Sequence, residues 1–231
     1  MQKRSNPNGP IILGITGTIA SGKSTVGRLL AERGIAVIDT DQLTHDVLTN
    51  DISVKKAIVE QFGPGVLEGA SSESACSEGN STKGDNAESA SEKGDNPDRP
   101  IDRKNLAKIV FQNSDSRRKL EQIVHPSVVL SCRRRIKELN KEKLVAVLVP
   151  LLFEANMADE YDEIWTVFTS EEVLKQRLGE RDKLDAIEIQ RRLQAQLPQS
   201  EKCSRADQVI DNSHSEAETA RQVNLLIEKL L

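Results

Sequence analysis

The 231 residues of this chain are enough for one sizeable core with one or two appended subdomains, and they make a second independent domain unexpected. The formal net charge of -4 gives no basic field for nucleic acid, and an aromatic content of 3% offers few platforms for base stacking. The three cysteines are widely spaced, which argues against a disulfide framework or a zinc site, and the first apolar run is too short for a signal peptide or a membrane span. We therefore expect a cytoplasmic protein that binds neither nucleic acid nor membrane.

The segment IILGITGTIASGKSTVGRLLAER, residues 11–33, carries the most specific motif of the chain. Its first six residues are mostly apolar and predict a buried strand, and Val26, Leu29 and Leu30 lie at helical spacing. Between these two elements the sequence reads Gly-x-x-x-x-Gly-Lys-Ser, which predicts a strand, a phosphate loop and a helix. The residues expected to bind the phosphates of ATP are Gly17, Thr18, Ile19, Ala20, Ser21, Gly22, Lys23, Ser24 and Thr25.

Each part of this motif has a chemical reason for binding a triphosphate. Gly17 and Gly22 allow backbone angles that let amide N–H groups converge on phosphate oxygens, and the helix adds its positive N-terminal end. Lys23 is expected to reach the β- and γ-phosphates, and the Ser24 hydroxyl is expected to ligate Mg²⁺. The alternative is a glycine turn that only packs a helix on a sheet, and it leaves the lysine unexplained.

Two carboxylates follow the second predicted strand, which covers residues 35–38. Because ligands of open α/β sheets bind at the carboxyl ends of the strands, Asp39 and Asp41 are expected to lie near the phosphates. A carboxylate there can accept a proton from an attacking hydroxyl or hold magnesium-bound water. Either residue could instead cap the next helix, expected to begin near Gln42, and Asp39 is the better candidate for a structural or metal-side role.

The remaining chain predicts an α/β fold. Further strands are expected at 144–149, 163–169 and 209–212, and helices lie between them, as in a parallel sheet. Asp102 is placed to cap a helix that begins with the next residues, and a helix starting at Ser114 leads to His125 and Pro126 and then to a basic helix. Residues 1–10 read as a flexible arm, and the Ser-, Gly- and Glu-rich residues 68–98 as a disordered insert.

Arginines are concentrated near the C-terminus, at Arg177, Arg181, Arg191 and Arg192. Together with the phosphate loop and the acidic pair they form the parts of a small-molecule kinase, since phosphoryl transfer mainly requires positioning and charge neutralisation. The alternative is that these arginines are exposed helix charges paired with neighbouring acids.

Several separated motifs resemble the dephospho-CoA kinase family, namely GITGTIASGKSTV, VIDTDQLTHDV, IDRKNLAKIVF, LEQIVHP, VPLLFE, QRLGERD and ADQVIDN. They cover the chain except the N-terminal arm and the insert. The resemblance implies a P-loop NTPase core with a parallel sheet, a helical acceptor-binding subdomain at about 42–140 and a lid at about 171–200. It also implies transfer of the ATP γ-phosphate to the 3′-hydroxyl of dephospho-CoA, with Mg²⁺ as cofactor.

By position, the resemblance assigns the catalytic base to Asp41 and a phosphate-facing lid arginine to Arg177, with Arg181 and Arg192 as further lid contacts. The residues expected on the acceptor side are Asp39, Asp102, Arg103, His125, Pro150, Leu152, Phe153 and Glu154. His125 has the alternative role of orienting the fold. The family's phosphate loop has glycines where this chain has Thr18 and Ala20, and β-branched Thr18 is expected to restrict the backbone and affect nucleotide affinity.

Two other functions remain open from the sequence. The same core serves other P-loop kinases, of nucleoside or shikimate type, and also proteins that sense ATP without turnover. A protein that merely binds ATP needs neither Asp41 as a base nor lid arginines. The sequence leaves the oligomeric state open.

Overall fold

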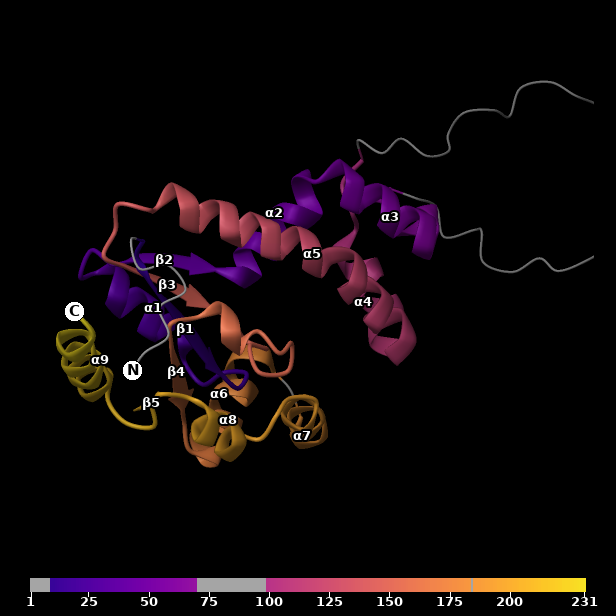
Figure 1. Ribbon diagram of the computed structural model, residues 1–231. Coiled ribbons are helices and arrows are strands. Elements are labelled where there is room, and N and C mark those ends of the chain that lie inside the picture. The colour runs from indigo at the N-terminus through magenta and orange to yellow at the C-terminus, as the bar shows by residue number, and fades with distance from the viewer. Residues whose placement is uncertain (1–8, 70–98, 184) are drawn as a thin grey trace, which may run out of the picture. The chain divides into compact units, whose positions relative to one another are not determined.

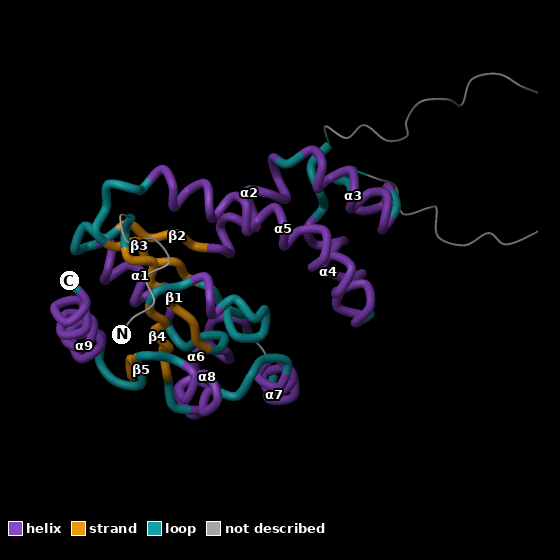
Figure 2. Tube along the Cα trace, viewed as in Figure 1, coloured by secondary structure: helices purple, strands orange, loops and turns teal. Residues whose placement is uncertain are grey.

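The computed structural model describes residues 9–69, 99–183 and 185–231 (Figures 1 and 2). Most of the expected arm and insert therefore lies outside the described residues. The chain divides into two compact units, one of which combines Met1–Asp41 with Cys132–Leu231, while the other is Gln42–Ser131. No helix in the described ranges is both long and apolar enough to cross a membrane.

The first unit is built on a five-stranded parallel sheet with the order β2-β3-β1-β4-β5. The strands are β1 (Ile11–Gly17), β2 (Ala36–Asp39), β3 (Leu144–Leu148), β4 (Glu163–Phe168) and β5 (Gln208–Asp211). Central β1 pairs with β3 and β4, and all seven of its residues are buried. The predicted α/β fold with a parallel sheet is confirmed.

Helices cover both faces of this sheet. The first unit contains α1 (Lys23–Ala31), α6 (Glu171–Asp182), α7 (Ala186–Gln194), α8 (Gln199–Arg205), α9 (Glu216–Leu230) and the short 3₁₀ helix η2 (Ala158–Glu160). Helices α1 and α9 pack together on one face (Figure 1). The side chains of Leu13, Ile15, Leu30 and Val223 share one apolar core there. On the other face α8 packs against β1 and β4, and the Thr166 hydroxyl donates to the carbonyl of Lys202 at 3.2 Å.

The second unit is helical. Its elements are α2 (Thr40–Asn50, of which Gln42 onward belongs to this unit), α3 (Ile52–Phe62), the 3₁₀ helix η1 (Pro64–Val66), α4 (Arg103–Gln112) and α5 (Ser114–Glu138, of which the residues to Ser131 belong to it). Its core includes the buried side chains of Ile58, Val66 and Leu106. Asp102 caps α4, as predicted, by accepting the N–H groups of Lys104 and Asn105 at 3.0 Å each.

Helix α5 differs from the expected pair of helices around His125 and Pro126. It is continuous, and Pro126 lies inside it. Val124 and Val128 pack into the same core on either side of the proline, which explains why the helix continues despite the missing N–H group.

Candidate active site

The phosphate loop connects β1 to α1 and depends on left-handed backbone conformations. Gly22 has φ 95°, and a Cβ at this position would overlap the side-chain amide nitrogen of Asn212. Ala20 also lies in the left-handed region, with φ 61°. A side chain in this conformation costs about 1–2 kcal/mol, so Ala20 is a strained position in the loop. The effect of Thr18 on nucleotide affinity stays a prediction.

Residues that follow β4 and β5 donate hydrogen bonds to a carbonyl group of the loop. The Ser21 carbonyl accepts hydrogen bonds from the Thr169 hydroxyl and the Asn212 side-chain amide, each at 2.8 Å. The Thr219 hydroxyl donates to Asn212 Oδ1 at 2.9 Å, which fixes the orientation of that amide. These contacts occupy the carbonyl side of the loop and use none of its N–H groups.

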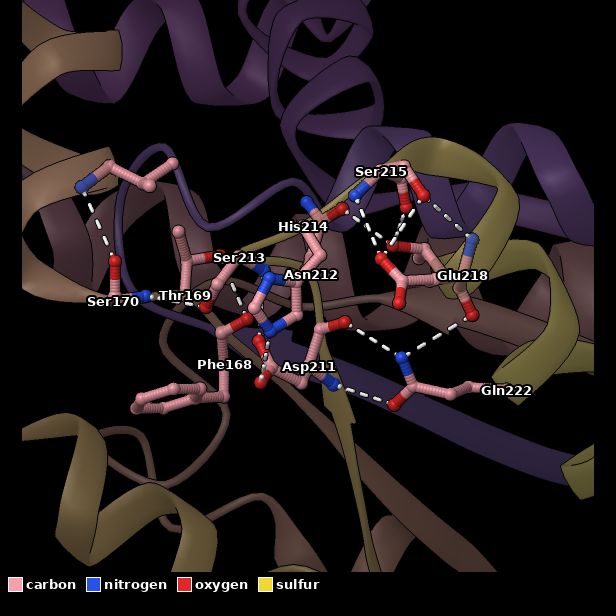
Figure 3. Close-up of polar contacts among 12 residues, drawn as sticks. Phe168, Thr169, Ser170, Asp211, Asn212, Ser213, His214, Ser215, Glu218 and Gln222 are labelled. Atoms are coloured by element: carbon pink, nitrogen blue, oxygen red, sulfur yellow. Dashed lines mark hydrogen bonds and ion pairs between the residues drawn. The ribbon is translucent and has the colours of Figure 1, made fainter.

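The connections after β4 and β5 are themselves tied together (Figure 3). The Asn212 N–H donates to the carbonyl of Phe168, and the Ser170 N–H donates to the Ser213 hydroxyl, both at 2.8 Å. The Gln222 side chain closes the end of β5 by bonding both the N–H and the carbonyl of Asp211. Asn212 therefore sits on a rigid support.

Arg177 lies against the same part of the loop, although it belongs to α6. Its guanidinium donates to the Asn212 carbonyl at 3.0 Å and to the carbonyls of Ala20 and Ser21 at 3.4 Å and 3.5 Å. The predicted lid arginine is thus next to the phosphate loop. Arg181 and Arg192, the other two lid candidates, lie in the last turns of α6 and α7.

Lys23 is the first residue of α1 and folds back over the loop. Its Nζ donates to the carbonyls of Gly17 and Thr18, both at 2.9 Å. Burial, and after it the nearby cation of Lys202, lower the pKa of Lys23 to about 8, although Asp41, Glu154 and Asp39 partly oppose the shift. A cation with this pKa remains largely protonated at neutral pH.

Asp39 and Asp41 differ in their local structure. Asp39 ends β2, whereas Asp41 lies in the first turn of α2, because this helix begins at Thr40 and not near Gln42. Asp39 Oδ1 accepts the N–H of Asp41 at 2.8 Å. The pKa of Asp41 is raised by desolvation and by the charge of Asp39, and Lys23 partly offsets the rise, although the residue still reaches solvent.

The loop after β3 places Glu154 in a strong ion pair. Glu154 Oε1 lies 2.7 Å from Lys202 Nζ and accepts the Leu197 N–H at 3.0 Å, whereas its Oε2 is buried and has no hydrogen-bond partner among the described residues. Burial alone would raise the pKa of Glu154, but the hydrogen bonds from Lys202 and Leu197 outweigh it and lower the pKa. Lys202 also donates to the Pro150 carbonyl at 3.1 Å.

The apolar residues of this loop are buried. Leu152 and Phe153 are 0% and 2% exposed, so both side chains are packed within the unit. The guanidinium of Arg205 lies 4.6 Å from the centre of the Phe153 ring. The two side chains, which were expected on the acceptor side, are thus positioned to hold the loop in place.

The other acceptor-side candidates lie in the unit Gln42–Ser131. Arg103 Nη1 lies 2.8 Å from His45 Nδ1, so a predicted acceptor-side residue contacts a histidine for which no role was predicted. His125 is exposed on α5. Asp102 uses one carboxylate oxygen to cap α4.

Sequence reasoning missed several residues that shape this site. Thr169, Gln196, Lys202 and Asn212 all contact the phosphate loop or Glu154. Asn212 lies within ADQVIDN, one of the motifs that resemble the family, and this motif could have identified it as a site residue. The other three residues stand in no recognisable motif.

Comparisons with known proteins agree with this geometry. The family model for dephospho-CoA kinase matches residues 11–72 and 96–218. Dephospho-CoA kinases of Geobacter metallireducens and Carboxydothermus hydrogenoformans are 38% and 37% identical to the chain over 92% and 94% of it, and the matches cover 93% of each relative.

Solved structures give the same result. A crystal structure from Thermus thermophilus matches 96% of the chain and 99% of its own, with a TM-score of 0.74 and 29% identity. The dephospho-CoA kinase of Campylobacter jejuni matches 94% of the chain and 96% of its own, with a TM-score of 0.57 and 25% identity. A shikimate kinase from Acinetobacter baumannii, at 17% identity and a TM-score of 0.50, covers 96% and 95% and shares the fold. The chain therefore belongs to the dephospho-CoA kinase family.

Proposed function

We propose that this chain transfers the γ-phosphate of ATP to the 3′-hydroxyl of dephospho-CoA and so produces coenzyme A and ADP. The observation that carries the proposal is the arrangement of the phosphate loop in a member of this family: Lys23 and Arg177 bond its carbonyls, the charge of Asp41 acts on Lys23, and the helix that follows has no side-chain cap. A cationic cradle beside a carboxylate is what phosphoryl transfer to a hydroxyl requires.

The loop fits the triphosphate of a nucleotide. Helix α1 has Gly22 at its N-cap position, so it has no side-chain cap, and its first turn contains no acidic residue; its first N–H groups are therefore available to phosphate oxygens. The hydroxyls of Thr18 and Ser21 are buried and have no hydrogen-bond partner within the described residues, and both can donate to a phosphate. We therefore assign residues 17–25 to ATP.

The same region fits Mg²⁺. Ser24 is exposed in the first turn of α1, and the carboxylates of Asp39 and Asp41 are close enough to influence the pKa of Lys23. Hydroxyl and carboxylate oxygens are the ligands Mg²⁺ prefers, and it is usually held by one or two of them together with phosphates. In the ranges that the structure describes, no cluster of three or more His, Cys, Asp or Glu side chains forms a metal cage. Bound Mg²⁺ would neutralise charge on the β- and γ-phosphates.

The chain's own residues then perform distinct tasks. Lys23 exchanges its contacts with the loop carbonyls for phosphate oxygens and follows the charge of the migrating group. Arg177 supplies a second cation next to Ala20 and Ser21. Asp41 accepts the proton of the 3′-hydroxyl, and its raised pKa makes it a stronger base than an ordinary aspartate.

Candidate acceptor-binding residues are proposed for each unit by itself. In the sheet unit the candidates are Glu154, whose Oε2 is an unused acceptor, and Asp39. In the helical unit they are Asp102, Arg103 and His125, as the family resemblance implies. We propose that residues 171–200 act as a lid that carries Arg177, Arg181 and Arg192.

A coupled assay tests this function. ADP release is measured with dephospho-CoA, with a panel of nucleosides and with shikimate, using wild type and Lys23→Ala. We expect turnover with dephospho-CoA that Lys23→Ala abolishes, and little with the other acceptors. Faster turnover with a nucleoside or with shikimate, or ATP binding without turnover of any acceptor, would overturn the assignment.

A further inference from the structure

Gln196 forms a direct contact with the phosphate loop from a distant part of the chain. It lies in the connection between α7 and α8, and its Oε1 accepts the backbone N–H of Ile19 at 2.8 Å. Ile19 is the third residue of the loop. The next residue, Leu197, donates its N–H to Glu154 at 3.0 Å. Two consecutive residues of this connection therefore contact the loops that follow β1 and β3.

The contact differs in kind from the other supports of the loop. Lys23, Thr169, Asn212 and Arg177 all bind carbonyl groups of the loop. Gln196 instead occupies an N–H group, on the donor side that anions use. It therefore fixes the part of the loop just before Ala20, whose left-handed conformation requires support from its surroundings.

The connection is also held firmly on its other side. The Gln199 side chain binds Thr169 twice, accepting its N–H at 3.1 Å and donating to its carbonyl at 2.9 Å. Lys202 anchors α8 to Glu154 and to the Pro150 carbonyl. The segment that follows Gln196 is therefore held in place by several contacts, whereas α7 precedes Gln196 in the chain.

We propose that Gln196 is a positioning residue that couples α7 to the phosphate loop. Its hydrogen bond keeps the loop in the conformation that binds the triphosphate, and nucleotide binding in turn fixes the connection from which α7 projects. The proposal rests on ATP binding at residues 17–25 and is independent of which acceptor is phosphorylated.

Gln196→Met tests this coupling, because methionine keeps the length of the side chain but lacks the carbonyl acceptor. Gln194→Met is the matched control, since Gln194 is the exposed last residue of α7, only two positions away. Binding of a non-hydrolysable ATP analogue with Mg²⁺ is measured by calorimetry without acceptor. Hydrogen exchange of α7 is followed with and without the analogue, and melting temperatures confirm folding.

We expect Gln196→Met to bind the analogue about five- to tenfold more weakly than wild type, the range that loss of one hydrogen bond produces. The analogue should slow exchange in α7 of wild type and Gln194→Met but not of Gln196→Met. If Gln196 had a merely structural role, Gln196→Met would lower the melting temperature but would leave the affinity for the analogue and the protection of α7 unchanged. Wild-type affinity, or undiminished protection of α7, in a folded Gln196→Met protein would overturn the proposal. Inactivity of wild type toward dephospho-CoA would instead contradict the proposed function.

Discussion

Replacing Lys202 with methionine measures how much the buried ion pair with Glu154 stabilises the fold. The two side chains are 2.7 Å apart and are 0% and 20% exposed. Removal of one partner from a buried pair leaves a charge without its counter-ion and costs about 3–5 kcal/mol. Because a fifth of the Glu154 side chain reaches water, we expect the lower end, about 3 kcal/mol of unfolding free energy. In a chain of this size that corresponds to about 6–12 °C in melting temperature.

The chain offers a matched control in Lys175→Met. Lys175 and Glu171 are also 2.7 Å apart, but their side chains are 51% and 65% exposed. A surface pair of this kind contributes about 0–1 kcal/mol. If burial and not distance determines the energy, Lys175→Met should unfold almost like wild type.

The effect of Lys202→Met should also depend on pH. In wild type the lowered pKa of Glu154 contributes stability that is present above its unfolded pKa and is lost as the pH falls through the folded pKa. In Lys202→Met, burial raises the pKa of Glu154, so the penalty is largest at neutral pH and is relieved in acid. Urea unfolding at pH 7 and at mildly acidic pH measures this difference, and Glu154→Gln/Lys202→Met should recover part of the lost stability. Equal stability of Lys202→Met and wild type at pH 7, or a deficit that does not shrink in acid, would refute this reasoning.

Four further outcomes follow from the phosphate loop. Lys23→Ala should lower kcat by about two orders of magnitude or more in the coupled assay while the protein stays folded, and near-normal turnover would contradict the kinase assignment. Asp41→Asn should lose about a hundredfold in kcat but keep its calorimetric affinity for ATP, whereas the reverse pattern in Asp39→Asn would exchange their roles. Because Lys23 has a pKa of about 8, kcat/KM for ATP should fall as the pH rises through about 8, and a flat profile would show that its charge is not needed. Ala20→Gly should relieve the left-handed strain and raise the unfolding free energy by about 0.5–1 kcal/mol in urea, whereas a loss of stability would contradict the strain.

The sheet was predictable because its signals are local. The segments 144–149 and 163–169 predicted β3 and β4 to within a residue. For β3 the signal is a continuous apolar run, as expected for a strand covered on both faces. The phosphate loop was predictable for a similar reason, because its glycines and Lys23 lie within eight residues of sequence.

The supports of the loop were not predictable, because they depend on contacts between distant segments. Asn212 and Ser21 are 191 positions apart, and Gln196 and Ile19 are 177 positions apart. Lys202 lies in a short charged helix, where a lysine is normally exposed, and only the folded chain reveals its burial. The left-handed conformation of Ala20 was not predictable either, because the sequence does not show which residue of the loop turns the chain.

The two aspartates show how a local boundary changes a functional argument. With both in an extended strand, Asp39 and Asp41 would point to the same face and be hard to distinguish. The strand instead ends at Asp39 and α2 begins at Thr40. The Asp39 carboxylate accepts the N–H of Asp41 in the first turn of α2, as an N-cap side chain does. One Asp39 oxygen thereby accepts a backbone N–H, whereas Asp41 takes part in this contact through its N–H and not through its carboxylate, as the proposed role of Asp41 as base requires. Desolvation and the negative charge of Asp39 raise the pKa of Asp41, so under the proposed mechanism the residue that supports the turn also makes Asp41 the stronger base.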